Sequence, residues 1–200
     1  MRRFLLLTGY LGELIEDYVA GTDWPEPVDI ECVDTGLGTP TGGRIALAGE
    51  RLREGPFFTT YADGLADLDL EALAAFHRTH GGLGTMTVVR PRTQFGVAEI
   101  DEEDRVRAFE EKPRLNHWVN GGFFRFEPGF LDYLDADSVL EDAPLRRLAA
   151  DGELHAFRHS GFWDCMDTYK DAALLNDLWR AGGAPWSVWE GRAAAPSRAG

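Results

Sequence analysis

Short apolar runs alternate with amphipathic segments along the first half of the chain, and this alternation restricts the fold most strongly. The predicted strands and helices follow one another at residues 4–7, 12–20, 29–34, 45–52, 57–61, 67–80 and 85–89. Strand and helix in alternation are typical of an α/β domain with a mainly parallel sheet. Ligands of such domains bind beyond the carboxyl ends of the strands, so polar residues at those positions are the first candidates for a site.

The second half of the chain has a different pattern. Residues 95–100 and 105–109 predict a hairpin around the acidic turn at residues 101–104. The further strands and helices are expected near residues 118–126, 129–134, 144–150, 154–158 and 168–181. The sheet of the first half is therefore expected to carry an additional part that is rich in strands.

Charge and cysteine content exclude several classes of function. The chain has 200 residues with 20 Lys and Arg against 34 Asp and Glu, a formal net charge of −14. This balance argues against nucleic-acid partners and against docking on anionic membranes. The two cysteines make no disulfide framework, which favours a cytoplasmic location. The length predicts a single domain at residues 1–190, followed by a disordered tail at residues 191–200.

A glycine-rich segment follows the second predicted strand and ends in Thr41, Gly42, Gly43 and Arg44. Backbone N–H groups of such a segment can approach a phosphate, and the start of the next helix adds a favourable dipole. The guanidinium of Arg44 can add a fork of donors. Because the segment has neither the Walker nor the dinucleotide pattern, an ordinary flexible turn is the alternative.

Acidic and basic residues also stand at the ends of predicted elements. Asp63 follows a strand and Asp167 precedes the last helix, and two carboxylates that meet at one point can hold Mg²⁺. The alternatives are a turn for Asp63 and a helix N-cap for Asp167. Lys112 precedes a proline that fixes the backbone, so it can face an anion or simply end a strand in solvent. The histidines have no spacing that indicates zinc.

Six blocks of the sequence occur in an order that is specific to one family. They are Phe-Leu-Leu-Leu-Thr-Gly-Tyr-Leu-Gly from residue 4, Val-Asp-Thr-Gly to Thr-Gly-Gly-Arg at 33–44, Thr-Tyr-Ala-Asp-Gly at 60–64, Glu-Lys-Pro at 111–113, Trp-Val-Asn-Gly-Gly-Phe-Phe at 118–124 and Gly-Phe-Trp-Asp-Cys-Met-Asp-Thr at 161–168. The chain resembles the sugar-1-phosphate nucleotidyltransferases from about residue 4 to Trp189. The Thr-Gly-Gly-Arg and Asn-Gly-Gly-Phe-Phe blocks favour the glucose-1-phosphate cytidylyltransferase branch over the thymidylyl branch.

The resemblance implies a fold, a reaction and partners. The fold is the nucleotide-diphospho-sugar transferase α/β fold, a Rossmann-like mixed sheet flanked by helices with a small β-rich sugar-binding part. The reaction joins CTP and glucose 1-phosphate into CDP-glucose and pyrophosphate with Mg²⁺, and it supplies deoxysugar and polysaccharide biosynthesis such as that of lipopolysaccharide O-antigen. Thymidylyl or uridylyl transfer is the alternative within the family, and a homo-oligomer is expected.

The resemblance also implies roles for individual residues. Asp63 and Asp167 match the aspartates that hold Mg²⁺, and Lys112 matches the lysine that meets the sugar phosphate. The residues implied in substrate binding are Thr41, Gly42, Gly43, Arg44, Gly96, Glu111, Asn120 and Gly121. Of these, Thr41 and Arg44 belong to the segment that touches the nucleotide.

The chain departs from the family at its beginning. The family starts with a strand and a Gly-Gly-x-Gly-Thr-Arg loop that cradles the triphosphate, whereas Met1 stands where the second strand begins. We therefore expect a domain that is incomplete at its N-terminus. Three interpretations are open for such a chain. In the first, the gene start is misassigned or the gene is split, and the protein is an ordinary enzyme. In the second, the chain is a non-catalytic relic or partner subunit that binds sugar phosphate or a sister chain, and in the third it is an enzyme completed by another chain. Gln94 and Cys165 also replace the arginine and proline that the relatives tend to have.

Overall fold

The computed structural model describes residues 2–24 and 27–188, and its contacts divide the chain into two compact units. The first unit comprises Met1–Phe57, Gly81–Gly84 and Phe126–His155. The second unit comprises Phe58–His80, Thr85–Arg125 and Ala156–Gly200. The predicted tail at residues 191–200 lies outside the described residues, and the single domain at residues 1–190 stays a prediction.

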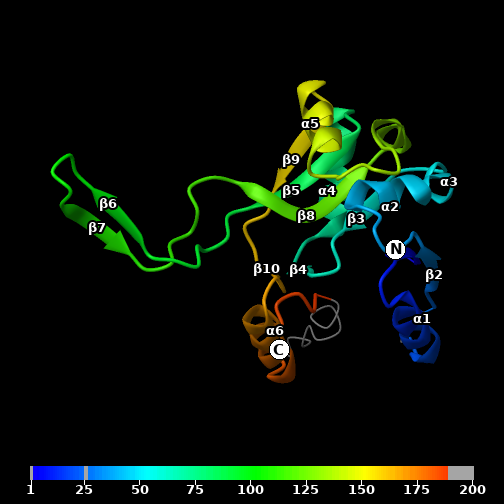
Figure 1. Cartoon of the computed structure of the whole chain (residues 1–200), viewed down its shortest axis with the longest axis horizontal. Coiled ribbons are helices and arrows are strands. Elements are labelled where there is room, and N and C mark those ends of the chain that lie inside the picture. Colours follow the sequence, from blue (N-terminus) through cyan, green and yellow to red (C-terminus); the bar gives the residue numbers. More distant parts are fainter. Residues whose placement is uncertain (1, 25–26, 189–200) are drawn as a thin grey trace, which may run out of the picture. The chain divides into compact units, whose positions relative to one another are not determined.

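Two parallel strands and a connecting helix form the beginning of the first unit. Strand β1 (Arg3–Thr8) pairs with β2 (Asp29–Asp34), and α1 (Gly12–Gly21) connects them (Figure 1). The ladder continues past β2, because the Thr35 N–H donates to the Thr8 carbonyl at 3.0 Å. This order of elements confirms the strand–helix–strand pattern predicted for the first 34 residues.

The next helix begins earlier than predicted. Helix α2 spans Thr41–Leu47 and α3 spans Gly49–Leu52, whereas the sequence predicted one helix from residue 45. The glycines that suggested a loop form the first turn of α2 instead, because their missing side chains let the helix approach the segment at residues 136–140 closely. A 3-10 helix at Pro128–Tyr133 and α5 (Ala143–Ala150) complete this unit.

Most residues of a four-stranded sheet belong to the second unit. Its order is β3-β8-β5-β9, formed by β3 (Phe57–Thr60), β8 (Val119–Phe126), β5 (Gly84–Val89) and β9 (Leu154–Arg158). Helix α4 (Leu70–His80) accompanies the sheet and buries Leu73. The Asp69 carboxylate caps α4 by accepting from the Glu71 and Ala72 N–H groups at 2.9 and 3.0 Å. A carboxylate in this position satisfies donors that the helix itself leaves free.

Two further strand pairs and one helix position the candidate site residues. Strand β4 (Gly64–Ala66) pairs antiparallel with β10 (Trp163–Cys165), and neither was predicted from the sequence. Strands β6 (Val97–Ile100) and β7 (Val106–Glu110) form the predicted hairpin, which is exposed along its whole length (Figure 1). Helix α6 (Tyr169–Arg180) follows β10. Parallel and antiparallel pairs therefore both occur, as the resemblance implied.

Among the residues that the structure describes, no helix combines the length and the apolar character needed to cross a membrane.

Candidate active site

A cavity of about 570 Å³ in the second unit brings together four of the predicted site residues. Asp63, Asn120, Gly121 and Asp167 all line it. They come from the turn between β3 and β4, the beginning of β8 and the segment between β10 and α6. The other lining residues are Tyr61, Ala62, Gly64, Gly122, Trp163, Cys165 and Met166. We call this the Asp63 cavity.

The β4–β10 pair explains why the two aspartates line the same cavity. Gly64 lies opposite Cys165 in this pair, so the residues on either side are brought together. The Met166 N–H also donates to the Asp63 carbonyl at 2.9 Å. The backbone therefore holds both segments in place and leaves both carboxylate groups out of the ladder.

The helix-cap interpretation of Asp167 is wrong. Thr168 is the N-cap of α6, and its hydroxyl accepts from the Asp171 N–H at 3.3 Å. The Asp171 carboxylate in turn accepts from the Thr168 N–H at 3.0 Å, which completes a capping box. Because Thr168 and Asp171 satisfy the end of the helix, the Asp167 carboxylate is left for another role.

Both aspartates keep their carboxylates largely free of internal contacts. Asp63 makes no side-chain hydrogen bond or ion pair with the residues that the structure describes. Asp167 accepts from the Cys165 thiol, whose Sγ lies 3.3 Å from Oδ2. A thiol is a weak donor, so this contact satisfies little of the carboxylate's capacity.

Negative charge is concentrated around Cys165. Burial, the hydrogen bond to Asp167 and the charges of Asp167, Asp164 and Asp63 together raise the pKa of the Cys165 thiol to about 12. Burial also raises the pKa of Asp164, as do the charges of Asp171 and Asp167, against the effect of the Cys165 N–H. The charges of both candidate metal ligands, Asp63 and Asp167, thus act on the partly buried Cys165 thiol.

Two carboxylates are enough protein ligands for Mg²⁺, but too few for a metal ion whose ligands all come from the protein. Within the described part of the chain, no group of three or more His, Cys, Asp or Glu side chains is arranged to hold a metal ion. Mg²⁺ is usually bound by one or two carboxylates together with water and substrate phosphates. Asp63 and Asp167 fit that smaller donor set.

The opposite wall of the cavity is built by Asn120 and the two glycines after it. The Asn120 amide accepts from the Gly122 N–H at 2.9 Å and donates to the Tyr61 hydroxyl at 3.3 Å. The Trp163 indole donates to the Gly121 carbonyl at 2.7 Å. Gly122 has φ +75°, and a Cβ there would lie 2.7 Å from the Tyr61 ring. Only glycine therefore fits at position 122 of this wall. Tyr61 and Trp163 also belong to the cavity and were not predicted as site residues from the sequence.

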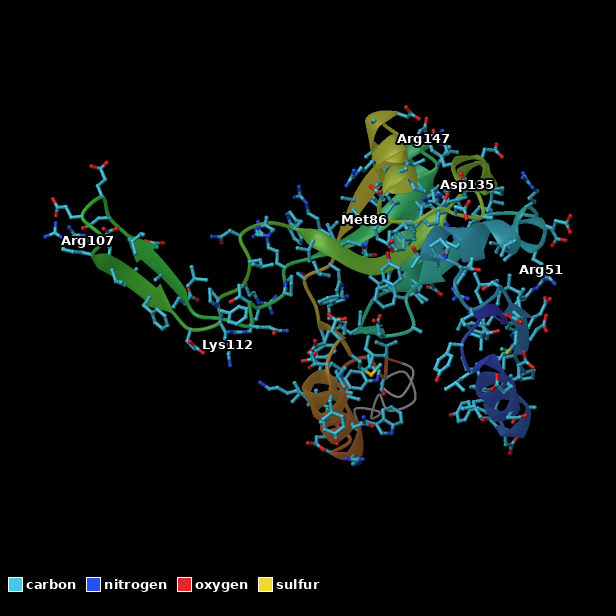
Figure 2. The ribbon with its side chains drawn as sticks, in the orientation of Figure 1. Arg51, Met86, Arg107, Lys112, Asp135 and Arg147 are labelled. Atoms are coloured by element: carbon cyan, nitrogen blue, oxygen red, sulfur yellow. The ribbon has the colours of Figure 1, made fainter. Side chains whose placement is uncertain are left out.

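Three of the predicted site residues, Gly96, Glu111 and Lys112, lie at the base of the hairpin and do not line the Asp63 cavity. A Cβ at Gly96 would lie 2.9 Å from the Glu111 carboxylate, so these two residues are neighbours. The Lys112 Nζ lies 3.8 Å from Glu111 Oε1, and its side chain is half exposed. Lys112 also has φ +50°, an uncommon conformation for a residue with a side chain. Figure 2 shows Lys112 where the chain leaves β7.

The residues expected on the nucleotide side belong to the first unit and contact their own neighbours. The Arg44 guanidinium donates to the Thr8 carbonyl at 2.6 Å and to the Thr35 hydroxyl at 2.5 Å. The Thr41 hydroxyl accepts from the Leu140 N–H and donates to the Glu141 carboxylate, both at 2.9 Å. These side chains hold the start of α2 in position.

Gly42 and Gly43 pack tightly in the same turn. A Cβ on Gly42 would lie 2.8 Å from the Ser138 carbonyl oxygen, and one on Gly43 would overlap the Ala136 carbonyl. The Gly43 N–H donates to the Ser138 carbonyl at 2.9 Å. Close packing is therefore a sufficient structural reason for both glycines.

Comparison with known proteins gives one consistent result. The family described as Nucleotidyl transferase matches residues 3–190. The chain is 37% identical to the probable glucose-1-phosphate cytidylyltransferase of Bacillus subtilis (strain 168), over 94% of this chain and 82% of that protein. It is 38% identical to the glucose-1-phosphate cytidylyltransferase of Salmonella typhi, over 95% of this chain and 82% of that protein.

Solved structures show the same fold at low sequence identity. HddC from Yersinia pseudotuberculosis aligns with a TM-score of 0.66 and 17% identity, over 90% of this chain and 79% of that chain. UDP-glucose pyrophosphorylase complexed with UDP-glucose aligns with a TM-score of 0.65 and 13% identity, over 90% of this chain and 81% of that chain. The α/β fold with a mixed sheet flanked by helices is thereby confirmed.

Proposed function

The chain belongs to the nucleotidyl transferase family, and from this premise we propose that it converts CTP and glucose 1-phosphate into CDP-glucose and pyrophosphate. The observation that carries the proposal is that Asp63 and Asp167, far apart in the sequence, line one cavity with Asn120 and Gly121. The identity of 37–38% with glucose-1-phosphate cytidylyltransferases over 82% of their length supports the choice of base and sugar.

The proposed reaction needs no side-chain nucleophile. A phosphate oxygen of glucose 1-phosphate attacks the α-phosphorus of CTP, a new P–O bond forms, and the bond to the β-phosphate breaks as pyrophosphate leaves. Both reactants are polyanions, so the protein contributes by orienting them and by compensating charge. The half-exposed ammonium of Lys112 is suited to neutralising the sugar phosphate. Asn120, with its amide fixed by Gly122 and Tyr61, is suited to orienting sugar hydroxyls.

Asp63 and Asp167 are the residues that would hold Mg²⁺. Their carboxylates line one cavity and have few internal contacts, which leaves oxygen atoms available to a hard cation. A bound Mg²⁺ supplies positive charge that offsets the charge of the phosphates.

Product formation tests the proposal directly. The purified chain is incubated with CTP, glucose 1-phosphate and Mg²⁺, and CDP-glucose and pyrophosphate are quantified, with UTP and dTTP in parallel reactions. We expect CDP-glucose to form with the highest kcat/KM among the three nucleotides. Equal or better use of UTP or dTTP would contradict the cytidylyl assignment. Binding of glucose 1-phosphate without turnover of any nucleotide would show a non-catalytic sugar-phosphate-binding chain instead.

The sugar-side role of Lys112 has a matched control, because the chain has only one other lysine, Lys170. Lys112→Ala should raise the KM for glucose 1-phosphate more than that for CTP, because the lost charge faces the sugar phosphate. Lys170→Ala, an exposed residue in the first turn of α6, should raise neither selectively. Equal effects of Lys112→Ala on both substrates would refute the assignment. Light scattering of the purified chain tests the homo-oligomer that the resemblance implies.

A further inference from the structure

A second cavity in the second unit, of about 290 Å³, is lined by three arginines. Arg90, Arg92 and Arg114 line it together with His159 and Asp164. The remaining lining residues are Val89, Pro91, Gly161, Phe162 and Trp163. The chain has a net charge of −14, so three arginines at one small cavity differ in sign from the average charge of the molecule. We call it the arginine cavity.

The backbone brings the arginines together. Arg92 and Arg114 lie opposite each other in an isolated antiparallel bridge. The Thr93 N–H donates to the Pro113 carbonyl and the Leu115 N–H donates to the Pro91 carbonyl, both at 2.9 Å, which fixes the two segments side by side. The backbone positions of Arg92 and Arg114 are therefore set before any ligand binds.

The side-chain partners of the arginines are neutral. Arg90 donates to the Asn116 carbonyl at 3.1 Å, and its guanidinium lies 4.6 Å from the centre of the Trp118 ring. Arg114 donates to the Arg90 carbonyl at 3.3 Å, and Arg92 donates to the Lys112 carbonyl at 3.4 Å. Across the described residues, none of the three forms an ion pair with a carboxylate. Each guanidinium has five N–H donors, so most of them remain available.

The side of the cavity at His159 is rigid. The His159 side chain is 10% exposed, its Nε2 donates to the Phe162 carbonyl at 3.0 Å, and the same atom lies 2.9 Å from Asp67 Oδ1. The His159 N–H donates to the Val88 carbonyl at 3.0 Å, which ties this segment to β5. A Cβ on Gly161 would overlap the Asp67 carboxylate. The loop between β9 and β10 is thus fixed by close contacts.

Three like charges around one small cavity repel one another unless an anion compensates them. Asp164 supplies a single carboxylate at the cavity and forms an ion pair with none of the arginines. Guanidinium groups bind phosphate oxygens through paired N–H donors, which makes a phosphate the anion that suits three of them. A volume of about 290 Å³ is at the lower end of ligand pockets and admits a small ligand.

We propose that the arginine cavity binds the phosphate group of a small phosphorylated molecule, at a site distinct from the Asp63 cavity. The two cavities share Trp163, and no carboxylate lines both of them. The proposal does not depend on the catalytic activity of the chain.

Calorimetric titration in EDTA tests the proposal, because Mg²⁺-dependent binding at the Asp63 cavity is then absent. The probes are inorganic phosphate, pyrophosphate and glucose 1-phosphate, each titrated into the whole chain. We expect one-to-one binding that Arg92→Gln and Arg114→Gln each weaken about tenfold or more, since each removes a charge-assisted contact. Arg146→Gln should leave the affinity unchanged, because Arg146 is an exposed residue of α5 that pairs with Asp142.

Further arms identify the ligand and guard against misfolding. Tighter binding of glucose 1-phosphate than of inorganic phosphate supports a phosphate ester, and tighter binding of pyrophosphate supports a diphosphate. Arg92→Lys and Arg114→Lys keep the charge and lose the paired donors, and we expect a smaller loss of affinity from them with unchanged circular dichroism. Absence of binding by all three probes would overturn the proposal. Binding that is lost in Asp63→Asn and retained in the arginine variants would also overturn it.

Discussion

The Asp63 cavity and the first turn of α2 were both expected to handle phosphates, and they differ in what their side chains already contact. Asp63 has no side-chain partner among the described residues, and Asp167 accepts only from a thiol. Arg44 and Thr41, by contrast, each make two internal hydrogen bonds. The position of a polar residue at the end of a strand is thus not enough to predict a binding role. A side chain that already uses its hydrogen-bonding groups inside the protein has fewer left for a ligand.

The difference arises from how each region is held in place. Around Asp63 the backbone of β4 and β10 makes the contacts, so the side chains stay available. In the first turn of α2 the side chain of Arg44 connects the ends of β1 and β2, and Thr41 connects the turn to residues 140 and 141. Substitutions should therefore affect catalysis in one region and stability in the other.

The largest expected effect is on catalysis in the Asp63 cavity. Asp63→Asn should lower kcat by roughly 10² to 10³, as loss of one group that stabilises transition-state charge does. The free energy of unfolding should change by less than about 0.5 kcal/mol, because no described contact is lost. Product formation and urea unfolding measure the two effects.

Asp177→Asn is the matched control for this substitution. Asp177 is an exposed residue of α6 that pairs with Arg180, so its loss should leave kcat unchanged. Full activity of Asp63→Asn would contradict the catalytic assignment. A large loss of stability would show that Asp63 has a structural role as well.

The next effect is on stability in the first turn of α2. Gly43→Ala should lower the free energy of unfolding by about 1–3 kcal/mol, because its Cβ would overlap the Ala136 carbonyl, a backbone atom that cannot rotate away. Gly38→Ala, where a Cβ would meet open space, should change stability little. Urea unfolding compares the two. Unchanged stability of Gly43→Ala with weakened CTP binding would favour a phosphate cradle over packing.

Local patterns predicted most of the fold. The bounds of β2 and β9 coincide with the predicted ones, and the hairpin of β6 and β7 is where alternation and an acidic turn indicated it. Helix α2 begins four residues earlier than predicted. Glycine is a poor helix former, so the sequence did not indicate a helix over Gly42 and Gly43. The packing of these glycines against residues 136–140 explains why the helix includes them.

Four of the residues that line the Asp63 cavity were named from the sequence, whereas the geometry of the cavity was not predicted. Asp63 and Asp167 were selected as carboxylates at the ends of elements, but their meeting depends on β4 and β10. Each of those strands has three residues, too few for a period to show, and they pair across about 100 residues of sequence. The N-cap was assigned one residue too early, because Asp and Thr are both good caps and only the contact with Asp171 decides between them.

A smaller effect on stability is expected from Arg44. Arg44→Gln removes a charged donor to Thr8 and Thr35, which should lower the free energy of unfolding by about 1–2 kcal/mol. Arg180→Gln, at an exposed pair on the surface of α6, should change it by less than about 0.5 kcal/mol. Thermal or urea unfolding of the two variants measures the difference. A raised KM for CTP with unchanged stability would instead identify Arg44 as a nucleotide contact.

The smallest expected effect concerns Asp164, beside the Asp63 cavity. Burial and the charges of Asp171 and Asp167 raise its pKa in the folded state above the ordinary value of 3.8, so the ionised form is disfavoured by folding. This penalty is fully present above the folded pKa and disappears as the pH falls below 3.8. Asp164→Asn should therefore stabilise the chain at pH 7, by less than about 1 kcal/mol because the group is partly exposed.

Urea unfolding of Asp164→Asn between pH 3 and pH 8 tests this sign. The amide oxygen can still accept from the Cys165 N–H, as the carboxylate does at 2.9 Å, so the substitution mainly removes charge. The gain should shrink as the pH falls toward 3.8, whereas Asp177→Asn should show no such gain because Asp177 is paired with Arg180. A gain that is independent of pH would mean that charge is not its cause. A gain that follows the pH would show that burial of Asp164 beside the charges of Asp171 and Asp167 lowers stability, unlike the internally bonded turn of α2.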